Sequence, residues 1–307
     1  MIEIKVKDFD LKDTMECGQA FRFSSESFES YEESAASIES GYANFSKINF
    51  SQDTDSKIFN IIAHGKVLSA IQKGDILILS CTEEDYNTIW KSFFDLDRDY
   101  AQIKAKISEN DPIMKEAISF APGTRLLNQD PYECLIHFII SQNNRIPMIK
   151  KVIENLSNKF GKSIDGTYFS FPTSYDLHKA SVEEIMECKT GFRAKYIKDA
   201  ARRIEEENFD PYYIKNLSEQ EAREHLMKIH GVGGKVADCV LLFSMQKYGS
   251  FPTDVWVKRI MEQFYFNGEE TKIPIIHQFA KEKWGEYAGF AQQYLFYYAK
   301  EKKIGKK

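Results

Sequence analysis

The sequence has few cysteines and no long apolar run, and both absences exclude classes of protein. Its cysteines number five, an odd number at wide spacing, so we expect neither a disulfide framework nor a metal site built on cysteines. They are Cys17, Cys81, Cys134, Cys188 and Cys239. The longest apolar runs, such as 76–79 and 138–140, are far shorter than the roughly 20 residues of a membrane-spanning helix. With no signal-peptide or transit-peptide pattern at its start, the chain is expected to be cytoplasmic, without a membrane partner.

The sequence also has no excess of basic residues, which does not favour a nucleic-acid binder. Its 307 residues include 41 basic and 46 acidic side chains, a net charge of −5. Residues 1–110 carry 12 basic and 20 acidic groups, a net charge of −8. Residues 111–307 carry 29 basic and 26 acidic groups, a net charge of +3. If the chain binds an anion, the second part is expected to do so.

The chain nevertheless contains enough apolar side chains for a substantial core. Hydrophobic residues make up 43% and aromatic residues 14%, which excludes global disorder. Short alternating or apolar segments occur at 2–6, 21–23, 58–62, 67–71 and 76–79. With a turn at Lys73 and Gly74, they predict an antiparallel sheet with one solvent-exposed face. Residues 24–56, with ten serines, seven acidic residues and one lysine, predict an exposed insertion.

From about residue 86 the pattern becomes helical. Two capping boxes, each a serine followed three positions later by glutamate, mark helix starts at Ser181 and Ser218. A sheet-bearing part followed by a mostly helical part predicts an α+β fold. We expect an antiparallel sheet domain over residues 1–110, including the insertion, and an all-helical domain over residues 111–307.

The most informative motif is HGVGGKVAD at 230–238, between two helical patterns. It predicts a helix-hairpin-helix at about 218–245, with Gly231 and Gly233 allowing a sharp turn. The free N–H groups at the start of the second helix suit an anion, in particular a nucleic-acid phosphate. On spacing alone, an ordinary helical hairpin whose glycines only permit the turn explains the motif equally well.

Lys235 and Asp254 are the candidate reactive residues. Lys235 lies in a first helical turn, where the helix dipole disfavours the ammonium and favours the free amine that a nucleophile needs. The alternative is a solvated lysine. Nineteen positions later, Asp254 precedes an apolar helical pattern and is predicted to be an N-cap. Its carboxylate either only caps that helix or also stabilises positive charge on a sugar.

At these residues the sequence resembles a known superfamily. Residues 229–256 resemble the helix-hairpin-helix and Gly/Pro…Asp signature of the DNA glycosylases, and lysine at 235 together with Asp254 resembles the bifunctional branch. Three further segments resemble the 8-oxoguanine DNA glycosylases in particular. They are CGQAFR at 17–22, NQDP at 128–131 with SQNN at 141–144, and GFAQ at 289–292 with Phe296.

The resemblance implies a fold and an activity. The implied fold is an N-terminal antiparallel sheet domain packed on a helix-hairpin-helix glycosylase domain. The implied activity is base excision repair, with removal of 8-oxoguanine and strand cleavage through a lysine Schiff base. It further implies a monomer acting on double-stranded DNA with oxidised guanine, associated with the nucleoid if the source is bacterial. It implies no required cofactor and no catalytic metal, but a monovalent cation held by carbonyls of the hairpin.

Roles for single residues also follow from the resemblance. Lys235 matches the Schiff-base nucleophile and Asp254 the assisting carboxylate. The carbonyl of Gly18 matches the group that recognises the damaged base. Gln292 and Phe296 match an amide and a ring that bind this base. Without the resemblance, a helix face packed in the core explains the pair equally well.

Other residues match a pocket wall and DNA contacts. In the family, Cys239 lines the base pocket. Asn143 and Arg193 match contacts to the base left in the partner strand, and Phe192 matches an aromatic wedge. Without the resemblance, Asn143 would be read as a helix terminator and Phe192 as a core residue. Gly231 and Gly233 flank the phosphate site of the hairpin, and His230 is expected to be structural.

Two departures from the family pattern affect specificity and DNA contact. Met148 stands where eukaryotic members have an arginine that reads the orphaned cytosine, so we expect weaker discrimination for cytosine opposite the lesion. Trp256 replaces a histidine that contacts phosphate. Two other functions remain open on the sequence: a glycosylase of the same fold for another damaged purine, and a non-catalytic DNA-binding module.

Overall fold

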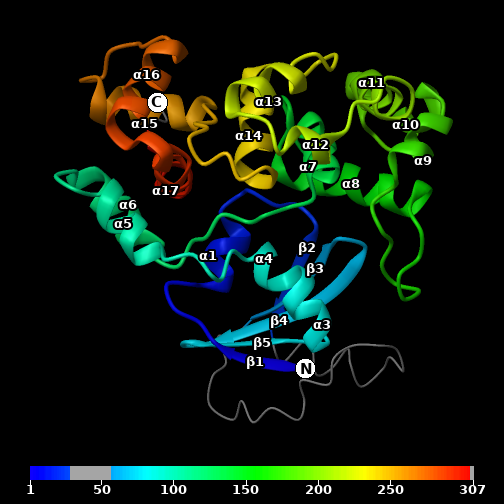
Figure 1. Ribbon diagram of the computed structural model, residues 1–307, viewed down its shortest axis with the longest axis horizontal. Coiled ribbons are helices and arrows are strands. Elements are labelled where there is room, and N and C mark those ends of the chain that lie inside the picture. The colour runs from blue at the N-terminus through cyan, green and yellow to red at the C-terminus, as the bar shows by residue number, and fades with distance from the viewer. Residues whose placement is uncertain (28–56, 305–307) are drawn as a thin grey trace.

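The computed structural model describes residues 1–27 and 57–304 of the chain. The predicted insertion at 24–56 lies outside these residues except for 24–27, which belong to a strand. Figure 1 shows two layers, a sheet at one end of the molecule and a larger group of helices at the other. The α+β fold, with the sheet first in the chain, is therefore confirmed.

The N-terminal part is a five-stranded antiparallel sheet in the order β1-β5-β4-β3-β2. The strands are β1 (Ile2–Lys5), β2 (Phe23–Ser27), β3 (Lys57–Ala63), β4 (Lys66–Lys73) and β5 (Ile76–Leu79). The predicted turn at Lys73 and Gly74 joins β4 to β5, with Gly74 at φ +58°. The segment predicted at 21–23 contributes only Phe23, because β2 begins there.

The centre of the sheet is covered on both faces. Ile58 and Asn60 alternate along β3 with Phe59 and Ile61, and all four are buried. The prediction of one solvent-exposed face is therefore wrong for this strand. The buried Asn60 side chain is satisfied within the sheet: Nδ2 donates to Glu26 at 3.0 Å, and Oδ1 accepts from a serine hydroxyl on β4 at 2.6 Å.

The rest of the described chain is helical. Early helices are α1 (Leu11–Glu16), α3 (Glu83–Asp85), η2 (Tyr86–Trp90), α4 (Lys91–Phe93), α5 (Tyr100–Ile107), α6 (Pro112–Phe120), α7 (Pro131–Ser141) and α8 (Ile146–Phe160). Then follow α9 (Ser174–Lys179), α10 (Val182–Glu187), η3 (Gly191–Arg193), α11 (Ala194–Glu206), α12 (Pro211–Ile214) and α13 (Glu219–Leu226). The last are α14 (Gly234–Ser244), α15 (Val255–Tyr265), α16 (Ile273–Trp284), η4 (Gly285–Tyr287) and α17 (Ala288–Glu301). None of them is long and apolar enough to cross a membrane, as far as the described residues go.

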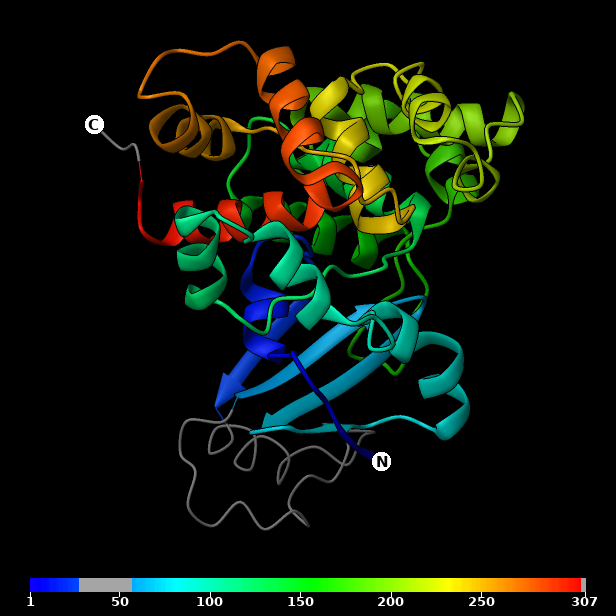
Figure 2. The ribbon, with the colours of Figure 1, turned by 60° about the vertical axis from the view of Figure 1, so that its left-hand side comes forward.

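Two hydrophobic cores meet where the sheet domain joins the helices. Tyr100 and Ile103 of α5 already belong to the core of the helical part, and so does Phe21 from the loop before β2. The C-terminal helix α17 packs against α5, α6 and α15, and α1 lies between the sheet and the helices (Figure 2). Residues from both ends of the chain therefore come together at this junction.

Candidate active site

The predicted helix-hairpin-helix is formed by α13 and α14. Both predicted capping boxes are present, and the one at Ser218 starts α13, where Oγ accepts from the Glu221 N–H at 3.3 Å. The chain then turns through Gly231 at φ +83°, where a Cβ atom would lie 2.4 Å from the Tyr196 ring of α11. Gly233 is the N-cap of α14 and is exposed, with open space where its side chain would be. Glycine is thus required at 231 by the fold, whereas Gly233 leaves the start of α14 accessible.

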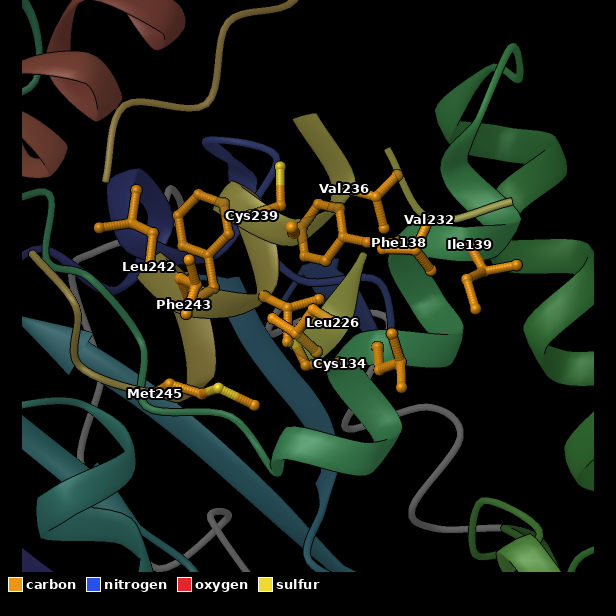
Figure 3. Close-up of a cluster of buried hydrophobic side chains, with 14 of the residues drawn as sticks. Cys134, Phe138, Ile139, Leu226, Val232, Val236, Cys239, Leu242, Phe243 and Met245 are labelled. Atoms are coloured by element: carbon orange, nitrogen blue, oxygen red, sulfur yellow. The ribbon is translucent and has the colours of Figure 1, made fainter. Parts of the chain in front are cut away.

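Lys235 lies on the first turn of α14, above apolar side chains. Its Nζ is 5.2 Å from the centre of the Phe138 ring, which comes from α7. One turn later, Cys239 is 3% exposed; burial raises the pKa of its thiol to about 11, and the charge of Lys235 opposes this rise. Figure 3 shows this packing of α14 on α7. The amine therefore lies over buried apolar side chains of α7 and α14.

Asp254 caps α15 as predicted, and the charge of Lys235 acts on its carboxyl group. Its Oδ1 accepts from the backbone N–H groups of Trp256 and Val257, both at 2.9 Å. Burial raises the pKa of the carboxyl group, while the Val257 N–H and the positive charge of Lys235 oppose the rise. Because the charge of Lys235 reaches both Asp254 and Cys239, the structure brings these three predicted residues together.

A second group of predicted residues gathers where the N-terminal loop meets α17. Gly18 has φ +93°, and a Cβ atom there would lie 3.0 Å from the Phe296 ring. Gln292, one turn before Phe296, is 4% exposed, and its Oε1 is buried with no hydrogen-bond partner among the residues that the structure describes. A buried amide oxygen with no partner is unfavourable unless a ligand donates to it. Gly18, Gln292 and Phe296 therefore form one candidate binding surface.

Phe138 contacts both the Lys235 amine and Phe21, in the N-terminal segment that carries Gly18, but no sequence pattern predicted it as a site residue. Its ring lies 5.7 Å from that of Phe21, three residues after Gly18, and it also lies beneath the Lys235 amine. The ring stacks on Phe243 of α14 at 5.5 Å, which fixes its plane. In the sequence, Phe138 is one residue of an apolar run and carries no signal of its own.

The residues predicted to contact the partner strand lie together at the end of α7 and the start of α11. Asn143 is exposed with φ +48°, and the Phe192 side chain is 53% exposed. Phe192 is therefore not the core residue that the sequence alone suggests. Arg193, by contrast, is 8% exposed, and its guanidinium donates to the carbonyls of Gln142, Asn143 and Thr190. In this structure Arg193 holds the turn that presents Asn143, rather than projecting into solvent.

The positions that depart from the family pattern lie near these groups. Met148 is on the first turn of α8, close in sequence to Asn143, and is 46% exposed. Trp256, on α15, lies beneath the guanidinium of Arg259 at 5.6 Å. His230 contacts the Tyr196 ring, and its backbone N–H donates to Asp199, which fits a structural residue. Among the described residues, no group of three or more His, Cys, Asp or Glu side chains is placed to hold a metal ion.

Comparison with known proteins agrees with this geometry over most of the chain. The family model of the 8-oxoguanine DNA glycosylase N-terminal domain matches residues 1–135. The model of the HhH-GPD superfamily of base excision DNA repair proteins matches residues 136–285. The chain belongs to the 8-oxoguanine DNA glycosylase family. The predicted family and fold class are thus confirmed.

Two solved structures of this family resemble the chain over nearly its whole length. MBOgg1, in complex with a low-affinity DNA ligand, is 42% identical with a TM-score of 0.86, covering 98% of this chain and 96% of that chain. The 8-oxoguanine glycosylase/lyase of Clostridium acetobutylicum, in complex with double-stranded DNA containing cytosine opposite 8-oxoG, is 41% identical. Its TM-score is 0.85, with 97% of this chain and 94% of that chain covered.

Among curated relatives, the N-glycosylase/DNA lyase of Saccharomyces cerevisiae is 37% identical over 211 residues, 57% of this chain and 56% of the relative. A probable N-glycosylase/DNA lyase of Methanothermobacter thermautotrophicus is 34% identical over 201 residues, with 64% of its length covered. The chain thus spans 56% and 64% of the length of these two curated relatives.

Proposed function

We propose that this chain is a bifunctional DNA glycosylase and lyase that removes 8-oxoguanine from duplex DNA in base excision repair. The observation that carries the proposal is the placement of Lys235, on the first turn of α14 and 5.2 Å from the Phe138 ring, near the half-buried carboxylate of Asp254. Burial raises the pKa of this carboxyl group, and the charge of Lys235 opposes the rise. The relatives named N-glycosylase/DNA lyase and 8-oxoguanine glycosylase/lyase support the same activity.

The chemistry begins at the amine of Lys235. The free amine attacks the anomeric carbon of the sugar, and the oxidised base leaves with the electron pair of the glycosidic bond. The nitrogen then loses a proton, and the bond between the anomeric carbon and the ring oxygen breaks, so that the sugar ring opens, its oxygen becomes a hydroxyl group and an imine forms. The imine acidifies the adjacent sugar proton, and loss of this proton permits β-elimination of the 3′ phosphate. Asp254, as a carboxylate, offsets the positive charge that develops on the sugar while the base leaves. No bound cofactor enters these steps.

The Gly18, Gln292 and Phe296 surface would select the base. Oxidation places a hydrogen on the imidazole-ring nitrogen that is only an acceptor in guanine. The Gly18 carbonyl accepts a hydrogen bond from this N–H. In guanine the same ring nitrogen is an acceptor, so it would repel the carbonyl oxygen instead of binding it. The unpartnered Oε1 of Gln292 supplies a further acceptor at 4% exposure, and Phe296 stacks on the flipped base.

The hairpin and the Asn143 turn would hold the duplex. The exposed N-cap Gly233 leaves the N–H groups of α14 open to a phosphate, which a net-acidic chain can bind without added positive charge. Phe192 fills the gap that the flipped base leaves, beside Asn143 and Arg193. We further propose that the chain acts as a monomer on chromosomal DNA. We also propose that carbonyl groups of the hairpin bind a monovalent cation.

Borohydride trapping on duplex DNA with a single 8-oxoguanine tests the proposal. Reduction of the imine links enzyme and DNA covalently, so the unaltered protein is expected to give a trapped complex. Lys235→Gln removes the nucleophile, and trapping and strand cleavage should fall below about 0.1% of the original rate, in line with losses on removal of a catalytic nucleophile. DNA binding, measured by fluorescence anisotropy, should stay within a few-fold.

A matched control is Lys115→Gln, at an exposed lysine on α6. This variant should trap as well as the unaltered protein. A chain that binds lesion DNA but is never trapped would be a non-catalytic binding module. Undiminished trapping of the Lys235→Gln variant would show that another amine is the nucleophile.

A further inference from the structure

The carbonyl groups around Gly18 are not equivalent. The Cys17 carbonyl accepts from Gln293 Nε2 at 3.2 Å, and the Gln19 carbonyl accepts from Gln129 Nε2 at 2.8 Å. Between them, the Gly18 carbonyl receives no hydrogen bond from any residue that the structure describes. The loop therefore leaves one acceptor open and has two glutamine side chains bound to the acceptors on either side.

The Gln19 side chain anchors the same loop from inside. It is fully buried, its Nε2 donates to the carbonyls of Thr14 at 2.9 Å and Arg125 at 2.7 Å, and its Oε1 accepts from the Leu127 N–H at 2.9 Å. Both donors and the acceptor of the amide are thus used. The loop is tied by these bonds to the segment that leads into α7.

Gln129 extends this connection to the helix that carries the reactive amine. While its side chain donates to the Gln19 carbonyl, its backbone N–H donates to the Phe243 carbonyl on α14 at 2.9 Å. One residue thus joins the Gly18 loop to the helix of Lys235. Gln293 makes the corresponding link to α17, next to Gln292 in sequence.

We propose that Gln129 and Gln293 are positioning residues that fix the Gly18 carbonyl relative to Lys235 and to the base-binding face of α17. The inference rests on the proposed function, because it assumes that the Gly18 carbonyl reads the lesion. The carbonyl distinguishes 8-oxoguanine from guanine through one hydrogen bond. Such a bond weakens steeply when its angle or length changes, so discrimination depends on how firmly the loop is held.

Selectivity of binding tests this proposal directly. In the Lys235→Gln background, which cannot react, the affinity for duplexes with 8-oxoguanine is compared with the affinity for matched duplexes with guanine. Adding Gln129→Leu or Gln293→Leu removes one hydrogen bond each. Either change is expected to lower the ratio of the two affinities by about 3- to 10-fold, the range for loss of one good hydrogen bond.

A second measurement separates positioning from general damage. Cleavage at an abasic site needs Lys235 but no base, so Gln129→Leu and Gln293→Leu in the otherwise unaltered protein should retain it within about twofold. Excision of 8-oxoguanine should fall in parallel with the affinity ratio. Equal losses in both reactions would overturn the proposal, because they would indicate a loosened fold.

The matched control is Gln72→Leu, at a glutamine of β4 in the sheet domain. The Gln72 side chain accepts from the Leu11 N–H at 2.7 Å and donates to the carbonyls of Phe9 and Gly74, but it makes no hydrogen bond to residues 17–19. Loss of the Gln72 side chain should reduce the stability of the protein and leave the ratio of the affinities for 8-oxoguanine and guanine duplexes unchanged. The proposal fails if Gln72→Leu lowers the ratio as much as the other two variants, or if those two leave it intact. Absence of any preference for 8-oxoguanine in the Lys235→Gln parent would instead refute the proposed function.

Discussion

At the scale of single residues, some side chains of the candidate site have a structural task in addition to the role proposed for them. Asp254 caps α15 with two backbone hydrogen bonds and also lies within reach of the charge of Lys235. Arg193 donates to the backbone carbonyls of Gln142 and Asn143, so its guanidinium holds the turn at Asn143, which is the residue proposed to contact the partner strand. The chemistry of the site thus depends on how each residue is held, and not only on which residue it is.

Met148 is the residue whose replacement should change specificity most simply. A methionine cannot make the charged hydrogen bonds that would hold a cytosine opposite the lesion. Met148→Arg adds such a group at a half-exposed position on α8, so the fold should tolerate it. We expect the preference for 8-oxoguanine opposite cytosine over the other three bases to rise by about tenfold, since a bidentate base contact contributes about 1–3 kcal/mol.

Rates of excision from four duplexes that differ only in the opposite base would measure this. Met186→Arg, at an exposed methionine on α10, serves as the control and should leave the four rates in their original proportion. An unaltered chain that already shows a strict cytosine preference would contradict the prediction that Met148 relaxes specificity.

At the scale of elements, the hairpin between α13 and α14 shows that two glycines of one motif can be needed for different reasons. Gly231 is required by packing, because its φ is +83° and the Tyr196 ring occupies the place of a side chain. Gly233 has an ordinary φ of −94° and open space around it. The first glycine therefore belongs to the fold, and the second belongs to the proposed phosphate site.

Alanine at these two positions should separate stability from DNA binding. Gly231→Ala combines backbone strain with a Cβ atom only 2.4 Å from the Tyr196 ring, so we expect a loss of about 2–4 kcal/mol in the free energy of unfolding. Gly233→Ala should change stability by less than about 1 kcal/mol but weaken DNA affinity about 3- to 10-fold, because its methyl group approaches the bound phosphate. Urea denaturation and fluorescence anisotropy on both variants would measure this, and equal behaviour of the two would contradict it.

At the scale of the whole molecule, the two parts of the chain are joined through buried polar groups. Arg22, just before β2, forms an ion pair with Glu133 of α7 at 3.3 Å, and the two side chains are only 6% and 14% exposed. His137 lies 3.5 Å from the same carboxylate, and burial keeps the pKa of its ring well below the usual value. Burial also raises the pKa of Glu133 to about 7, although the Arg22 charge opposes this.

This junction should make stability depend on pH. A carboxyl group with a pKa near 4.5 when unfolded and about 7 when folded stabilises the fold fully at low pH. That contribution is lost as the pH rises between these two values. Glu133→Gln removes the titration, so its stability relative to the original protein should increase by about 1–3 kcal/mol between pH 5 and pH 8. Urea denaturation at the two pH values measures this difference.

The surface glutamate Glu154, which pairs with Lys151, provides the control. Glu154→Gln should show the same small difference from the original protein at both pH values. If the stability of Glu133→Gln relative to the original protein were also the same at both pH values, the prediction would be wrong. The ion pair with Arg22, and not burial, would then determine the pKa of Glu133.

Several features of this protein were determined by the sequence alone, because each depends on residues close together in the chain. The strands at 58–62, 67–71 and 76–79 follow from local alternation and a glycine turn, and the capping boxes at Ser181 and Ser218 follow from hydrogen bonds within four residues. The hairpin and the N-cap at Asp254 are local in the same sense. Such patterns can be read without knowing what lies across the fold.

Other features were decided only by the tertiary structure, because they depend on contacts between distant segments. No local signal shows that both faces of β3 are covered, that Phe138 lies beneath Lys235, or that Arg193 donates to the turn of Asn143. Nor does the sequence show that Gln129 links residue 19 to residue 243. A packing contact or a long-range hydrogen bond requires two segments to meet in space, and only the folded chain specifies which segments do.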